Sequence, residues 1–157
     1  MQTGFSNRMK DVFTYVREEV LRLGDKSIGI EHLFLGILRD GGGTAITALN
    51  HLGIEINNLK DIIENSIPQK DIQKKTSEEE NISFQKQTER VLKKSILERK
   101  NLQDGKIKTI HVLLAILLDK NNIVTSTLEH MKVTYDILLE TYINLSGGIE
   151  LYNKNNF

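Results

Sequence analysis

The 157-residue sequence contains no cysteine, no tryptophan and a single proline. Without cysteine it can form no disulfide, no thiolate nucleophile and no zinc–thiolate site. Lysine plus arginine total 21 and aspartate plus glutamate also total 21, so the formal net charge is zero. Such a chain lacks the positive charge that draws nucleic-acid binders to phosphate. No nucleic-acid partner is therefore expected, and recognition must depend on local surface patches.

Long apolar runs are also missing from the sequence. No stretch approaches the roughly 20 apolar residues that cross a membrane, and the polar, mixed start at residues 1–10 does not resemble a signal peptide. The absence of cysteine is compatible with a reducing compartment. We therefore expect a cytoplasmic protein that does not bind membranes.

Apolar residues recur with the spacing of α-helices. Between residues 5 and 23 they fall three and four positions apart, which places them on one helical face. Ser6 is expected to cap this helix at its N-terminus and Gly24 to end it. Further helices are predicted over Glu31–Arg39, from a cap at Thr44 to Gly53, and over Asn57–Ser66.

The second half of the chain repeats the first. A shift of 79 positions, which carries Phe5 onto Phe84, aligns the two halves without a gap. We therefore predict an all-α fold of eight helices, built as a tandem duplication of a four-helix unit with pseudo-two-fold symmetry. Residues 1–68 would form the first copy, 69–82 a polar linker and 83–146 a second, diverged copy.

Two segments of the first copy resemble the Clp N-terminal repeat family. They are Phe5–Met9, which begins Phe-Ser-Asn-Arg, and Ile28–Leu38, which contains Glu-His followed by an apolar run. The second copy carries diverged versions of both segments. The resemblance covers about residues 3–146 and is greatest to the N-terminal domain of ClpC-type AAA+ unfoldases.

This resemblance implies a role in protein recognition. Full-length members are hexameric ATPases that thread unfolded proteins into the ClpP peptidase, and their N-terminal domain binds substrates and adaptors. The sequence lacks a phosphate-binding loop, since the glycines at 41–43 are followed by Thr44 without the required lysine. The chain would thus be the recognition domain, not an enzyme and without a cofactor, and residues 147–157 would begin a tether to ATPase modules of the same polypeptide. A free-standing accessory protein that docks on a Clp protease complex is the alternative.

In some ClpC relatives this domain binds phosphoarginine, and the resemblance implies one candidate pocket. Ser6 would supply a hydroxyl to the phosphate and Glu31 a carboxylate to the guanidinium. The second copy has Gln85 and Ile110 at the matching positions, and isoleucine cannot pair with a guanidinium. At most one pocket survives. The structural alternatives are that Ser6 is a helix cap and Glu31 a first-turn acid stabilised by the helix dipole.

A second candidate surface is apolar. Phe5 and Phe84 open the two copies at equivalent positions. In relatives, phenylalanines at these positions line a peptide site between the repeats. The alternative is that both rings only anchor their helices to the core.

The remaining polar residues do not indicate catalysis or metal binding. The histidines lack the spacing of metal ligands, so no metal is expected, and the equivalent His32 and His111 are expected to hydrogen-bond loop carbonyls. Glu18 and Glu19 are expected to lie in solvent on a helix exterior. No nucleophile and base are placed together, so a small helical hydrolase finds no support.

Overall fold

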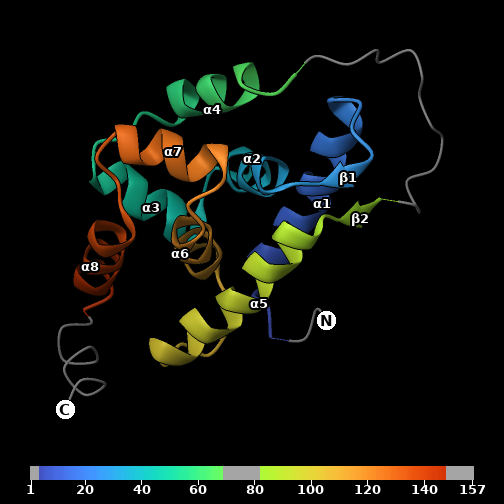
Figure 1. Ribbon diagram of the computed structural model, residues 1–157. Helices are drawn as coiled ribbons and strands as arrows, with labels where there is room; N and C mark the ends of the chain where they lie inside the picture. The colour runs from blue at the N-terminus through green and yellow to red at the C-terminus, as the bar shows by residue number, and fades with distance from the viewer. Residues whose placement is uncertain (1–3, 69–81, 148–157) are drawn as a thin grey trace.

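The duplication in the sequence reappears as two sets of four helices in the computed structural model, which describes residues 4–68 and 82–147 (Figure 1). Over these residues the all-α fold of eight helices is confirmed. The predicted linker and tether lie almost wholly outside the described residues. The helices are α1 (Asn7–Arg22), α2 (Ile30–Asp40), α3 (Gly43–His51), α4 (Ile56–Asn65), α5 (Lys86–Asn101), α6 (Thr109–Leu118), α7 (Ile123–His130) and α8 (Tyr135–Leu145).

The helices of the two copies correspond in register. α1 and α5 begin 79 positions apart (86 − 7), as do α2 and α6 (109 − 30) and α4 and α8 (135 − 56). Contacts between the copies are reciprocal, because α3 packs on α6 and α8 while α7 packs on α2 and α4. The pseudo-two-fold symmetry expected from the sequence is thus present in the packing.

Two short parallel strand pairings, which the periodicity did not predict, join the copies. β1 (Ser27–Ile28) pairs with β2 (Ser83–Phe84), and Figure 1 shows the two strands side by side. An isolated bridge joins Phe5 to Ile107. A shift of 79 carries Phe5 onto Phe84 and Ile28 onto Ile107, so the strand pair and the bridge are symmetry equivalents.

Through these pairings the first residues of each copy, its leading segment, bond to the other copy, so the two leading segments are exchanged. The backbone N–H of Ser6 donates to the carbonyl of Ile107 at 2.9 Å, and the N–H of Gln85 donates to the carbonyl of Ile28 at 3.0 Å. Each copy therefore begins against the loop that precedes the second helix of the other copy.

That loop is fixed by an aspartate–histidine pair. In the first copy, His32 Nδ1 accepts the backbone N–H of Gly29 at 2.9 Å and His32 Nε2 lies 2.6 Å from the Asp25 carboxylate. The expectation of a loop carbonyl partner was wrong, because the group to be satisfied at this helix start is an N–H donor. Nδ1 must then be unprotonated, and Nε2 carries the proton toward the carboxylate.

The second copy repeats this arrangement. His111 accepts the N–H of Lys108 at 2.8 Å and lies 2.6 Å from Asp104, which also accepts the hydroxyl of Tyr142 at 2.9 Å. Burial lowers the pKa of both His32 and His111, in spite of nearby acids that raise it. Both rings are therefore held neutral near pH 7.

Glu19 is buried, contrary to the expectation that it lies in solvent. Its side chain accepts Nε and Nη2 of Arg22 at 3.1 and 2.8 Å and Nη1 of Arg39 at 3.2 Å. Burial alone would raise the pKa of Glu19, but the two arginines outweigh that effect and hold the pKa below its ordinary value. The arginines thereby allow a charged carboxylate to remain at 2% exposure.

The equivalent acid of the second copy has lost this arrangement. Glu98 is 4% exposed, but Asn101 and Leu118 occupy the positions equivalent to the two arginines. Among the described residues, Glu98 Oε1 has no hydrogen-bond partner. The copies thus share a buried acid and differ in what surrounds it.

The glycines at 41–43 shape the turn between α2 and α3. Gly41 ends α2 in the left-handed region at φ 73°, and a Cβ at Gly42 would lie 2.6 Å from the Arg8 guanidinium. The prediction that Thr44 caps α3 was wrong, because Gly42 takes that position. The Thr44 hydroxyl instead accepts the N–H of Ile110 in α6 at 3.2 Å, which ties the two copies together.

Candidate functional site

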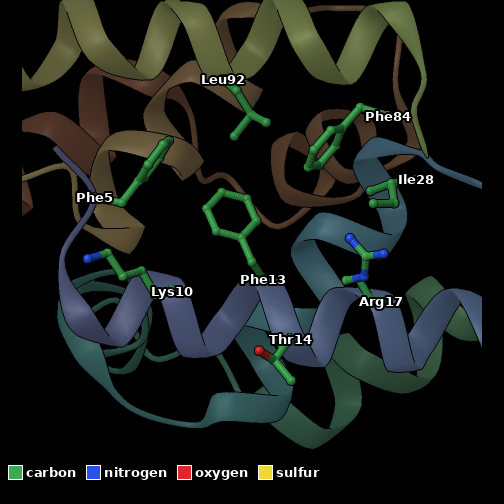
Figure 2. Close-up of a pocket in the computed structure, with 8 residues that line it drawn as sticks. All are labelled: Phe5, Lys10, Phe13, Thr14, Arg17, Ile28, Phe84 and Leu92. Atoms are coloured by element: carbon green, nitrogen blue, oxygen red, sulfur yellow. The ribbon is translucent and has the colours of Figure 1, made fainter. Parts of the chain in front are cut away.

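The structure brings Phe5 and Phe84 to one cavity. Phe13 lies between them, with ring centroids 5.1 Å from Phe5 and 6.2 Å from Phe84, and both pairs meet edge to face. The cavity has a volume of about 250 Å³ and opens between α1 and α5, as Figure 2 shows. Aromatic and aliphatic side chains of this kind offer an apolar surface to a ligand.

The cavity straddles the pseudo-two-fold axis. Phe5 is equivalent to Phe84, and Phe13 of α1 is equivalent to Leu92 of α5, since 13 + 79 = 92. Neither copy alone supplies all the residues that line the cavity. The cavity exists because the exchanged leading segments place Phe5 and Phe84 on either side of the axis.

The two phenylalanines differ in exposure. Phe5 is 6% exposed and belongs to the core, whereas Phe84 is half-buried beside the opening. Phe5 thus anchors the start of α1 and also contributes its ring to the cavity wall. Phe84 is the more accessible of the two to a ligand.

One wall of the cavity is polar and positively charged. Lys10, Thr14 and Arg17 of α1 line the opening, and all three are exposed. They recur at intervals of four and three, so they share one face of the helix. These residues, together with Phe13, Ile28 and Leu92, were not singled out as site residues from the sequence. The equivalence of Phe13 and Leu92 was the available signal that they meet near the axis.

The structure does not bring Ser6 and Glu31 together. α1 and α2 are antiparallel. The start of α1 meets the end of α2, where Arg8 pairs with Asp40 at 2.6 Å. The end of α1 meets the loop that leads into α2, where the N–H of Asp25 donates to the carbonyl of Val20. Ser6 lies at the first end and Glu31 beside the second. Ser6 and Val20 are fourteen positions apart (20 − 6) along α1, which is about 20 Å at 1.5 Å per residue. A single phosphoarginine pocket cannot use both side chains.

Each of these residues instead faces the other copy. Ser6 is the N-cap of α1, as expected, with its hydroxyl accepting the N–H of Met9 at 3.1 Å, and it lies against Ile107. Glu31 lies in the first turn of α2, near the strand that precedes Gln85. Its carboxylate folds over Gly29 and makes no hydrogen bond or ion pair with the described residues.

The described residues do not indicate a metal site, a membrane span or a histidine base. Over these ranges no group of three or more potential ligands could hold a metal ion, and no helix is long and apolar enough to span a membrane. Both ring nitrogens of His32 and of His111 are engaged. Neither ring therefore offers a free base.

Comparisons with known protein families and with known sequences point to the same family. The model of the Clp repeat (R) N-terminal domain matches residues 4–136. The chain is 27% identical over 146 residues to the chaperone protein ClpB of Oceanobacillus iheyensis, and 27% identical over 146 residues to the negative regulator of genetic competence ClpC/MecB of Bacillus subtilis. Each alignment covers 93% of this chain and 17% of the relative, so the chain spans under a fifth of their length.

A solved structure shares the fold. The ClpV N-domain in complex with a VipB peptide superimposes with a TM-score of 0.72 at 12% identity, covering 89% of this chain and 85% of that one.

Proposed function

Since this chain belongs to the Clp repeat N-terminal domain family, we propose that it recognises protein substrates and adaptors for an ATP-dependent Clp unfoldase and delivers them for unfolding and degradation. The observation that carries the proposal is the apolar cavity between α1 and α5, with Phe84 half-buried at its opening. An open cavity with aromatic walls can accept an apolar side chain from an extended or partly unfolded protein. The ClpV N-domain, which has the same fold, forms a complex with a peptide.

The proposal extends to the protease complex in which the chain would act. The chain would act beside ATPase modules of the same polypeptide and with a ClpP peptidase, in the cytoplasm. The alternative is a free-standing accessory protein that docks on such a complex. The mass of the native protein on an immunoblot distinguishes the two, because attached ATPase modules would make it several times heavier than 17.9 kDa.

Truncation of Phe84 tests the cavity. We expect Phe84→Ala to weaken the binding of apolar peptides or an unfolded model protein at least tenfold, because the ring forms one wall. Leu97→Ala is the matched control, since Leu97 is an apolar residue of α5 that is 57% exposed and does not line the cavity. Fluorescence anisotropy gives the affinities and circular dichroism confirms folding. Equal affinities for the two variants would contradict the proposal.

Phosphoarginine recognition is a finer proposal, restricted to the start of α2. There the Glu31 carboxylate has no partner among the described residues and so could receive a guanidinium. The other end of α1 offers the Ser6 hydroxyl beside Ile107 and no acid at position 110. An NMR titration with phosphoarginine should therefore shift the Glu31 resonances and leave those of Ser6 in place. The absence of a Glu31 shift at millimolar ligand would contradict this proposal.

A further inference from the structure

We infer that the cavity selects protein segments in which an apolar side chain is flanked by carboxylates. This inference rests on the proposed function and specifies its substrate class. Eight side chains line the cavity, of which two are cationic and none is acidic. In a protein of zero net charge the attraction must come from this local arrangement.

The two cations bracket the apolar opening. Lys10 precedes Phe13 by three residues and Arg17 follows it by four, and Figure 2 shows the ring between the two charged side chains. Seven residues of helix separate Lys10 from Arg17, which is about 10 Å and nearly two full turns. Both charges therefore lie on the face of α1 that borders the cavity.

This spacing sets the pattern of the ligand. An extended chain advances about 3.3 Å per residue, so 10 Å corresponds to about three residues. Side chains of an extended chain alternate between two faces, so only residues an even number of positions apart point the same way. The favoured segment is thus extended, with acidic residues at positions i and i+4, about 13 Å apart, and an apolar residue at i+2 on the same face. The long lysine and arginine side chains span the difference between this distance and about 10 Å. The apolar side chain would enter beside Phe84, and the carboxylates would meet Lys10 and Arg17.

The charge lies on one wall only. On α5, the positions equivalent to Lys10, Thr14 and Arg17 are Glu89, Lys93 and Ile96, and none of these lines the cavity. The neighbouring acid of α1, Glu18, is engaged by Arg39 at 2.5 Å. A segment with flanking acids would therefore bind against α1 and not in the symmetry-related orientation.

A set of three labelled peptides tests the inference. Each has a central phenylalanine with serine on either side of it, and aspartate, asparagine or lysine two positions before and two positions after the phenylalanine. With the intact chain we expect the aspartate peptide to bind about three to ten times more tightly than the asparagine peptide at low salt, which is the range for two exposed ion pairs. The lysine peptide should bind most weakly. The difference should shrink severalfold at about 0.5 M salt.

Two substitutions locate the effect. Lys10→Gln and Arg17→Gln should each reduce the preference for aspartate, whereas Lys93→Gln on α5 should leave it unchanged. If the three peptides bind equally, and Phe84→Ala still weakens them all, the acidic selection is wrong and the proposed cavity function stands. If no peptide binds at millimolar concentration, both fail.

Discussion

Removal of the Glu98 carboxyl is expected to stabilise the fold, whereas removal of the equivalent Glu19 carboxyl is expected to destabilise it. The changes are Glu98→Met and Glu19→Met, because methionine has a similar length and adapts to irregular packing. The two sites are symmetry equivalents on α5 and α1, and both acids are buried. The comparison therefore isolates the effect of the surrounding arginines.

The magnitude follows from the hydrogen bonds of each carboxyl. Glu98 Oε1 has no partner among the described residues, and leaving a buried polar atom unpaired costs about 1–3 kcal/mol. Glu98→Met should therefore raise the free energy of unfolding by about 1–2 kcal/mol and the melting temperature by about 2–8 °C.

Glu19 should respond in the opposite direction. It accepts three hydrogen bonds from Arg22 and Arg39. The two arginine side chains are 47% and 38% exposed, and each retains a second acid, Glu64 or Glu18. Solvent screening therefore reduces the loss, and we expect Glu19→Met to lower the free energy of unfolding by about 1–3 kcal/mol.

Urea unfolding followed by circular dichroism measures both variants. Leu118→Arg supplies an independent check, since it places an arginine at the position equivalent to Arg39. It should stabilise the chain that carries Glu98 and should gain nothing in the Glu98→Met background. If Glu98→Met destabilises as strongly as Glu19→Met, the carboxyl is satisfied by a partner such as a bound water, and the reasoning is refuted.

Two further predictions concern packing and pH. Gly36→Ala should lower the free energy of unfolding by about 1–3 kcal/mol, because its Cβ would lie 2.4 Å from Val16 and 3.1 Å from two backbone atoms of α1. The control Ala115→Gly, at the equivalent position, should cost about 1 kcal/mol; a neutral Gly36→Ala would contradict the close packing of α1 on α2. Stability should also fall with acid. The pKa of His32 and of His111 lies below the ordinary 6.5, so the unfolded chain binds protons that the folded form does not. The loss begins as the pH drops below about 6.5, and urea titrations of the His32→Gln/His111→Gln variant should show a flatter slope across this range.

Helices and their equivalence were predictable from the sequence, because both depend on local periodicity and on residue identity at a fixed shift. Ser6 as a cap and Glu31 as a first-turn acid also follow from local rules. The strand pairings did not follow, since two-residue strands leave no alternation to detect. These pairings decide which residues of the two copies meet, because they place Ser6 against Ile107 and Gln85 against Ile28.

Burial of charge was equally hidden in the sequence. The charge of Glu19 on the buried side of α1 is stabilised partly by Arg39, which reaches it from α2, twenty positions along the chain. The candidate cavity was predictable in part, because the repeat identified Phe5 and Phe84 as equivalents. The contribution of Lys10 and Arg17 depends on how α1 faces α5, which no local pattern records.

The exchange of leading segments also affects how the protein unfolds. The loop before α2 is closed by a strand of the second copy, and Ile107 before α6 is bridged by Phe5 of the first. Neither copy can unfold without removing backbone hydrogen-bond partners from the other. The protein should therefore unfold as one cooperative unit, with a single transition in calorimetry. A ligand held between α1 and α5 would then protect the amide hydrogens of both copies from exchange, including those far from its contacts.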